Sequence, residues 1–312
     1  MMIDVSGLEQ LLTGALFFAS NFALVVGLTA VGAAINEQSG VLNLGHEGVM
    51  LLGAATGFVV TFWTESGWLG LLAGAIAGAG LGALKVAWSI VIKTEQVING
   101  LLLVPIGIGL ANMLYKHQFL HASSPPRIAP MPTIPVPFLH EMPIIGPVVF
   151  NRSAAFYGAI LLIALAAHFL GHTRTGMIIR AAGESPEALD FNGIAVDRYR
   201  VVALLIGTAF TGLAGALLTI DQVHIYSARM TAGRGWIAIA IVIVGGWRPW
   251  TCLLAALLFG FIDMLQFQVQ VQSAAVPYEI LLSLPYLATI AVLALRQGTV
   301  RPPAALGIPY VR

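Results

Sequence analysis

The sequence predicts an all-α protein that crosses a lipid bilayer many times as a bundle of helices. Two compositional observations predict this fold. Of 312 residues, 58% are hydrophobic and only 9% are charged, whereas soluble domains carry about 25% charged residues. The mean hydropathy is +0.89. The third observation is that apolar runs long enough to cross a bilayer recur along the chain, which predicts about nine spans (about 8–10).

The spans are placed by the rule that about 20 mostly apolar residues cross the hydrocarbon core. The run 236–248 is short, so we expect it to be tilted or broken. The run 41–63 begins with polar residues, which predicts a broken or re-entrant element near 41–50. The whole chain, 1–312, is expected to form a single transmembrane domain. The expected spans lie near residues 8–33, 41–63, 68–92, 97–115, 153–171, 201–220, 236–248, 251–268 and 278–295.

The distribution of Lys and Arg predicts the orientation, because cytoplasmic loops carry an excess of both. An outer N-terminus and a cytoplasmic C-terminus place ten of the 15 basic residues at the cytoplasmic side. The net charge of +1 offers no basic footprint for nucleic acid. The cytoplasmic ten are Lys85, Lys93, Arg174, Arg180, Arg198, Arg200, Arg248, Arg296, Arg301 and Arg312.

Two connections between spans are hydrophilic. The loop 116–152 holds eight of the 16 prolines, so we expect an extended, stiff, non-helical segment on the periplasmic side. The connection 173–200 is expected in the cytoplasm. Glycines repeat at four-residue spacing, as at Gly74, Gly78 and Gly82. This spacing favours close helix packing within the bundle over a homodimer seam.

The run Gly40 to Gly48 places Asn43, His46 and Glu47 among three glycines at the start of an apolar segment. Such polar groups are costly in a membrane unless they face a cavity or a partner. Two interpretations stay open. One is a broken helix that lines a translocation path. The other is a polar turn at the cytoplasmic interface, with Glu47 capping the next helix.

Other polar residues lie inside predicted spans. Asn99 and Asn112 share one span, and Asp263 and Gln266 share another. The two asparagines would bind a polar solute or hydrogen-bond to neighbouring helices, which is the commoner use. Asp263 requires a partner in lipid.

Motifs for enzymatic chemistry are missing from the sequence. Cys252 is the single cysteine, and the pairs His168/His172 and His117/His121 lack the H-E-x-x-H pattern of a catalytic zinc site. The phosphate-binding loop G-x-x-x-x-G-K-[ST] does not occur. We therefore expect a non-catalytic chain that binds no metal or cofactor itself. If ATP drives its work, a separate ATPase hydrolyses it.

A short helix is predicted within the cytoplasmic connection. Ser185 is a good N-cap, Pro186 suits the first helical position and Gly193 can end the helix in a left-handed conformation. An ATPase groove or the bundle itself would support this short helix. The predicted ATPase-coupling residues are Gly183, Glu184, Ser185, Pro186, Glu187, Ala188, Leu189, Phe191, Gly193 and Ile194.

From about residue 30 onward the chain resembles the permease subunits of bacterial ATP-binding-cassette importers. It resembles the branch for branched-chain amino acids, ribose-type sugars and nucleosides, and looks closest to the nucleoside permeases. The ribose branch usually has an Asp-Leu-Ser run at Asn43-Leu44-Gly45, and His46 stands at an often apolar position. The stretches that carry the resemblance are Ser39–Gly48, Arg180–Ile194 with Gly207–Gly215, Met230–Ala238 and Pro303–Tyr310.

The resemblance implies an importer of the bacterial inner membrane that works by alternating access. Residues 180–194 would couple it to a cytosolic ATPase, and a second permease, a paralogue or another copy, would complete the channel. A periplasmic or lipid-anchored solute-binding protein would dock on loops 116–152 and 222–235, with Arg229 and Arg234 as its contacts. The implied translocation path comprises Asn43, His46, Glu47, Asn99 and Asn112. The solute would be a nucleoside or, alternatively, a simple sugar.

Two rival functions follow from the residues alone. An ion-coupled secondary transporter would use Glu47 or Asp263 at mid-membrane and usually has inverted repeats, which the sequence does not show clearly. A membrane enzyme would need a nucleophile–base pair or a metal cluster, and neither is recognisable.

Overall fold

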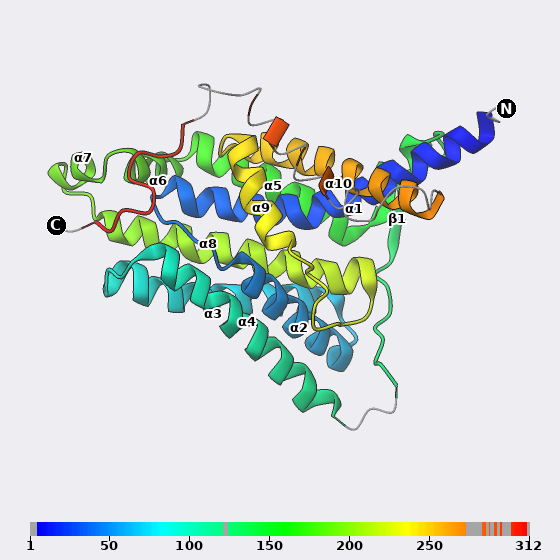
Figure 1. The fold of residues 1–312 in the computed structure, drawn as a ribbon, viewed down its shortest axis with the longest axis horizontal. Coiled ribbons are helices and arrows are strands. Elements are labelled where there is room, and N and C mark those ends of the chain that lie inside the picture. The colour runs from blue at the N-terminus through cyan, green and yellow to red at the C-terminus, as the bar shows by residue number, and fades with distance from the viewer. Residues whose placement is uncertain are drawn as a thin grey trace.

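The computed structural model describes residues 5–120, 124–272, 283–284, 287, 290–291, 294 and 301–310, without the side chains of 5–11 and 268–272. Within these residues the protein is a helical bundle (Figure 1). The α-helices are α1 (Val5–Gln38), α2 (His46–Thr64), α3 (Gly67–Val86), α4 (Gln96–Phe119), α5 (Ala154–His172), α6 (Arg174–Glu184), α7 (Pro186–Phe191), α8 (Val196–Leu217), α9 (Arg234–Gly245) and α10 (Pro249–Gln272).

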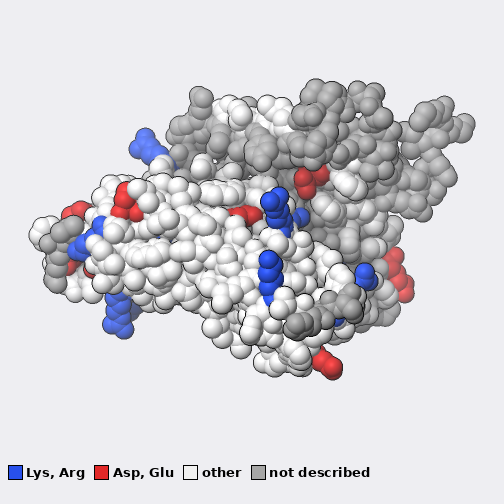
Figure 2. All heavy atoms as spheres, turned by 60° about the horizontal axis from the view of Figure 1, so that its bottom comes forward, with Lys and Arg blue, Asp and Glu red and all other residues white. Residues whose placement is uncertain are grey.

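Seven helices of the described residues are long and apolar enough to cross a membrane, and they confirm the expected all-α polytopic bundle. Figure 2 shows a face on which charged side chains are sparse among uncharged residues, as lipid contact requires. The expected span near 278–295 lies outside the continuously described residues. The seven are Leu12–Gln38, His46–Thr64, Gly67–Val91, Gln96–Phe119, Ala154–His172, Val196–Val223 and Pro249–Phe267.

Helix α8 lies at the centre of the bundle, packed against α1, α2 and α3. Small residues make this packing possible. A methyl group added at Gly78 of α3 would overlap the backbone of Thr208 and Gly212 in α8, and one added at Gly53 of α2 would also overlap Gly212. The glycine pattern therefore brings helix backbones together inside the bundle, because lipid offers no hydrophobic force between helices.

The predicted break near residues 41–50 is a non-helical stretch over residues 41–45, so α2 begins at His46 and not at residue 41. Gly40 turns the chain with φ +87°, a left-handed conformation that glycine adopts without strain. Val41 and Asn43 are fully buried. This irregular backbone is surrounded by protein, which is the condition under which membranes tolerate it.

Helix α9 is the short apolar run expected at 236–248. Its 12 residues extend about 18 Å at 1.5 Å per residue, less than a hydrocarbon core of about 30 Å. It runs from Arg234 to Gly245, and the flanking Gly233 and Gly246 both have positive φ. The described part of the bundle therefore contains a non-helical break at residues 41–45 and a helix, α9, that is too short to cross the membrane core.

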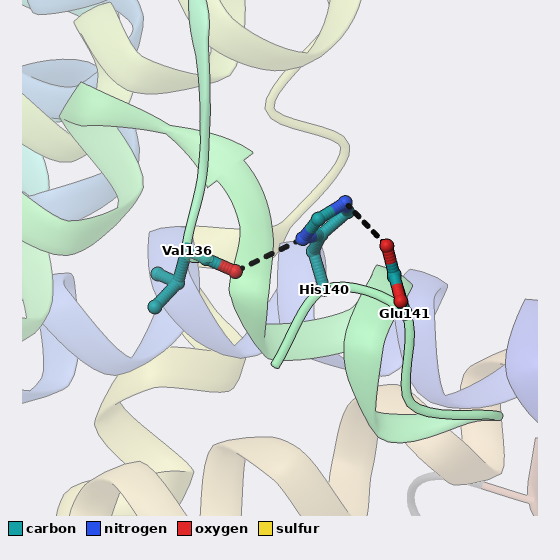
Figure 3. Close-up of polar contacts among 3 residues, drawn as sticks. All are labelled: Val136, His140 and Glu141. Atoms are coloured by element: carbon teal, nitrogen blue, oxygen red, sulfur yellow. Dashed lines mark hydrogen bonds and ion pairs between the residues drawn. The ribbon is translucent and has the colours of Figure 1, made fainter. Parts of the chain in front are cut away.

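The proline-rich loop is partly regular. Helix α4 continues to Phe119, so residues 116–119 are helical. After residues 121–123, which the structure does not describe, β1 (Thr133–Pro135) pairs antiparallel with β2 (Asn151–Ser153). Residues 146–150 form a single π-helical turn, η2. His140 lies between these strands, with Nδ1 3.0 Å from the Val136 carbonyl oxygen and Nε2 4.0 Å from the Glu141 carboxylate (Figure 3). The loop is therefore compact and not uniformly extended.

The connection expected at 173–200 is largely helical. It contains α6 and α7, and α8 already begins at Val196. The segment 180–194 therefore divides between the end of α6 and the whole of α7. Helix α7 and the C-terminal segment 301–310 lie at one end of the bundle, and the start of α1 lies at the other (Figure 1).

Candidate functional site

Glu47 joins the start of α2, directly after the non-helical break, to the start of α9. It is the second residue of α2, and its carboxylate accepts hydrogen bonds from the backbone N–H groups of Gly233 (2.9 Å) and Gly235 (2.8 Å). These donors lie at the N-terminus of α9, where unpaired N–H groups and the helix dipole favour a negative charge. Glu47 thus caps α9, and not α2 as one interpretation of the sequence proposed.

A cavity of about 490 Å³ opens beside this cap. Pockets for small ligands typically measure about 300–1,000 Å³. A carboxylate, an amide, a guanidinium and a hydroxyl line it together with apolar side chains, so it can bind a polar solute of moderate size. Its lining residues are Glu47, Leu51, Ile108, Asn112, Ala228, Arg229, Thr231 and Ala232.

Five aromatic rings form a cluster next to Asn112. Tyr226 and Tyr115 have ring centroids 4.6 Å apart, and the Tyr226 hydroxyl lies 3.4 Å from Asn112 Oδ1. Burial raises the pKa of Tyr226 to about 12, so this hydroxyl keeps its proton and can donate. The cluster joins α2, α4 and the segment after α8, and comprises Phe58, Phe62, Tyr115, Phe119 and Tyr226.

Of the five residues predicted for the translocation path, Glu47 and Asn112 line this cavity. Asn43, in the break, and His46, the first residue of α2, are fully buried. Asn43 Oδ1 accepts from the Gly45 N–H (3.0 Å), and His46 Nδ1 lies 2.8 Å from the Thr211 hydroxyl of α8. The first contact holds the non-helical segment and the second ties the start of α2 to α8, and the role of both residues in transport stays a prediction.

Asn99 lies in a separate polar network. Its Oδ1 accepts from the buried Lys85 ammonium and from Ser89 Oγ (3.1 Å). Lys85 also donates to the Gln96 carbonyl (2.6 Å), and Gln96 Oε1 accepts from the Leu42 N–H (2.8 Å). The network therefore ties the first turn of α4 to α3 and to the break. Lys85 was expected at the cytoplasmic side, and its side chain is fully buried.

The two arginines predicted to contact a binding protein differ in their surroundings. Arg229 is exposed and lines the cavity. Arg234 donates to the Met230 carbonyl (2.8 Å) and lies over the Phe22 ring at 5.8 Å. The charges of Asp263 and Glu47 act on Arg234, although no ion pair within 4.0 Å joins Arg234 to either carboxylate among the described residues.

The predicted coupling residues form one corner of the bundle. Gly183 packs against the backbone of Gln38 and Gly40, without room for a side chain. Ser185 occupies the N-cap position of α7, although its side chain makes no capping hydrogen bond. Gly193 ends the segment with φ +75°, as expected. Phe191 is 92% exposed, an unusual environment for a large apolar side chain.

Several residues that line the cavity were not predicted from the sequence. Leu51 follows Glu47 by four positions and Ile108 precedes Asn112 by four, so each pair shares a helix face. The pairs Phe58/Phe62 and Tyr115/Phe119 have the same spacing. This four-residue spacing was the pattern from which the sequence could have placed these side chains on one helix face. Thr231 lies in the stretch Met230–Ala238 that carries the family resemblance, but no local pattern placed its side chain at the cavity.

Residues 15–293 match the family described as branched-chain amino acid transport system / permease component. The chain belongs to this family. The match covers most of the sequence and confirms the resemblance found from sequence motifs. The protein is thus a multi-pass membrane permease.

Three curated relatives match over nearly the whole chain. A putative glucose ABC transporter permease of Haloferax volcanii is 36% identical over 93% of this chain and 95% of its own. The guanosine ABC transporter permease of Bacillus subtilis is 32% identical over 93% and 94%. The nucleoside ABC transporter permease of Lactococcus lactis is 30% identical over 91% and 92%. No solved structure matches this chain.

Proposed function

We propose that this permease forms half of the membrane channel of an ATP-binding-cassette importer and carries a nucleoside by alternating access. The observation that supports this best is the cavity between Glu47, Asn112, Arg229 and Thr231. It contains both hydrogen-bond acceptors and donors, as a solute rich in hydroxyl and amide groups requires. The relatives that act on guanosine and nucleosides agree with this choice.

The aromatic cluster favours a nucleobase. Bases stack on aromatic side chains, with about 1–3 kcal/mol for each stacked base. Tyr226 lies next to Asn112 and Tyr115 packs on Tyr226, so both rings lie behind the cavity lining. The Asn112 amide can pair with a base edge or a ribose hydroxyl. Transport needs contacts weak enough to release the solute, and a few such groups meet that need while a separate binding protein supplies the affinity.

The proposal includes three partners. A cytosolic ATPase would dock on residues 183–194, since this chain has no phosphate-binding loop. A second permease, either a paralogue or another copy, would form the other half of the channel. A solute-binding protein would contact the segments 116–152 and 222–235 on the opposite side. The membrane would be the inner membrane, with the N-terminus outside and the C-terminus in the cytoplasm.

A simple sugar is the second candidate solute. The relative at 36% identity is named for glucose, and the polar lining of the cavity would also bind sugar hydroxyls. A sugar would not engage the aromatic cluster through a base. Replacing Tyr115 and Tyr226 together with leucine would therefore impair uptake of a nucleoside more than uptake of a sugar.

The decisive experiment is uptake by the reconstituted importer. The permeases, ATPase and binding protein are placed in proteoliposomes with ATP on the ATPase side, and labelled guanosine and glucose are offered separately. We expect guanosine uptake that requires ATP and the ATPase. Uptake by this chain alone in energised, ATP-free vesicles would instead establish an ion-coupled transporter. ATP-dependent uptake of glucose without guanosine would select the sugar.

A further inference from the structure

Arg200 of α8 connects three segments that are distant in sequence. Its guanidinium donates from Nε to the Ser39 carbonyl (3.1 Å), from Nη2 to the Ala182 carbonyl (3.3 Å) and from Nη1 to the Ile308 carbonyl (3.3 Å). The side chain is 2% exposed. A planar group with five donors suits this task, since it bonds in several fixed directions at once.

Backbone hydrogen bonds strengthen the same connection. The Ala305 N–H donates to the Gly183 carbonyl (2.8 Å), and the Gly307 N–H donates to the Gly40 carbonyl (3.0 Å). The C-terminal segment 301–310 is therefore held against both the end of α6 and the turn before the non-helical break. Figure 1 shows this segment beside α6 at the end of the bundle that carries α7.

A cleft of about 360 Å³ lies between this segment and the start of α7. Glu184, Pro186 and Glu187 form one wall, and Ile308, Pro309 and Tyr310 form the other. Both glutamates are exposed, as is Ile308 at 58%. Within the described part of the chain, no ion pair within 4.0 Å joins either glutamate to a Lys or Arg, although the charge of Glu187 acts on the nearby Arg200. The cleft thus combines an acidic rim with an apolar wall.

We propose that the C-terminal segment 301–310 forms the second wall of the surface on which the ATPase docks, and that the cleft accepts a Lys or Arg side chain of that ATPase. This inference rests on the proposed function. The aliphatic stem of such a side chain would cover Ile308 and Pro309, and its charge would lie between Glu184 and Glu187. Complementary charge of this kind sets the orientation of partners at an interface.

The hydrogen bonds of Arg200 and Gly307 link the docking surface to the membrane-spanning helices. Arg200 and the Gly307–Gly40 hydrogen bond join the cleft to residues 39–45, and this break leads directly into α2 and Glu47. A displacement of the cleft is therefore passed to the cap of α9 through backbone contacts. The segment 301–310 acts in docking and in transmission.

Cysteine cross-linking tests the proposal, because the native Cys252 is buried. Ile308→Cys is compared with Ile92→Cys as a control. Ile92 is a similarly exposed isoleucine (62%) in the turn before α4, and the start of α4 lies beside the break. Phe191→Cys on α7 tests whether the ATPase binds at α7, independently of the C-terminal segment. Each variant is co-expressed with the other importer subunits and treated with a short thiol-to-amine cross-linker. We expect the amount of ATPase cross-linked at Ile308→Cys to exceed the amount at Ile92→Cys about tenfold, the ratio that a preference of about 1.4 kcal/mol gives.

The outcomes separate the two levels of the proposal. Cross-linking of the ATPase at Phe191 with no excess at Ile308 would overturn the role of the C-terminal segment and leave the proposed function intact. A cross-linked product with the mass of two copies of this chain would also overturn it. No ATPase product at any position, together with no ATP-dependent uptake, would contradict the proposed function itself.

Charge reversal tests the basic occupant independently. Glu184→Arg combined with Glu187→Arg should lower the amount of ATPase that co-purifies by about tenfold. Glu65→Arg, an exposed residue at the opposite end of α2, is the matched control and should change nothing. Unchanged co-purification of the double variant, with Glu65→Arg also unchanged, would exclude a Lys or Arg in the cleft.

Discussion

The carboxylate of Glu47 accepts a 2.8 Å hydrogen bond from the backbone N–H of Gly235, 188 residues further along the chain. Gly235 cannot carry a side chain here, because an added methyl group would overlap the backbone of Glu47. The start of α2 and the start of α9 are therefore in direct contact at the cavity. A movement of either helix changes the position of the other and the shape of the cavity between them.

Replacing Glu47 should weaken this contact. Glu47→Ala removes the acceptor of two backbone donors, so we expect the free energy of unfolding to fall by about 1–2 kcal/mol, the range for loss of a helix cap. Glu47→Gln keeps one carbonyl oxygen, so its free energy of unfolding should lie between those of Glu47→Ala and the unaltered protein. Thermal denaturation in detergent and solute uptake are the measurements. Glu65→Gln, on the exposed end of α2, is the control, and an equal effect there would refute the specific role of Glu47.

Asn99 and Asn112 should behave differently although they share α4. Asn99→Ala leaves the buried Lys85 ammonium with one acceptor fewer, so stability should fall by about 1–3 kcal/mol. Asn112→Ala removes only the long 3.4 Å hydrogen bond of Tyr226, so stability should fall by no more than about 1 kcal/mol. The KM of uptake should rise about fivefold, as loss of one hydrogen bond of about 1 kcal/mol to the solute predicts. The comparison of unfolding midpoint with KM checks both. A raised KM for a stable Asn99→Ala protein would return Asn99 to the translocation path.

Two glycines of α3 provide a matched test of helix packing. Gly78→Ala should destabilise the bundle by about 1–3 kcal/mol, because the new methyl group meets the α8 backbone. Gly80 has no neighbour within 4 Å of an added Cβ. Gly80→Ala should therefore be neutral or stabilising by about 0.5–1 kcal/mol, since alanine is the better helix residue. Similar unfolding midpoints for the two variants would contradict the close α3–α8 contact.

The short helix α7 gives a test of coupling. Glu187→Arg combined with Leu189→Arg should leave the permease folded and uncouple ATP hydrolysis from uptake, since both positions lie on α7 at the proposed ATPase contact. Solute-stimulated ATPase activity of the reconstituted complex is the measurement. Glu65→Arg, an exposed change at the opposite end of α2, is the control. Unchanged stimulation of the double variant would remove α7 from the interface.

Arg200 should not tolerate replacement by lysine. Lysine keeps the charge but cannot donate to three carbonyls arranged around a planar group. Arg200→Lys should lower the number of solute molecules carried per ATP hydrolysed by about threefold or more, which corresponds to roughly 0.7 kcal/mol or more of lost coupling. Arg198→Lys, exposed on the same helix, should match the unaltered protein. An Arg200→Lys complex with a normal transport ratio would show that Arg200 has only a structural role.

The sequence was sufficient for the elements that depend on local composition. Long apolar runs specify spanning helices because a backbone in lipid must satisfy its own hydrogen bonds. Glycine spacing, the break after Gly40 and the left-handed end at Gly193 follow from the same local rules. These features required no knowledge of which helices are neighbours.

The site depended on the tertiary structure. Glu47 was singled out by its position, yet its partners are backbone donors 186 and 188 residues away, and no local pattern indicates such a pair. Asn99 and Asn112 have the same side chain in one helix, and neighbouring helices place one against Lys85 and the other at the cavity. Side-chain chemistry sets what each residue can bind, and helix packing decides which partner it meets.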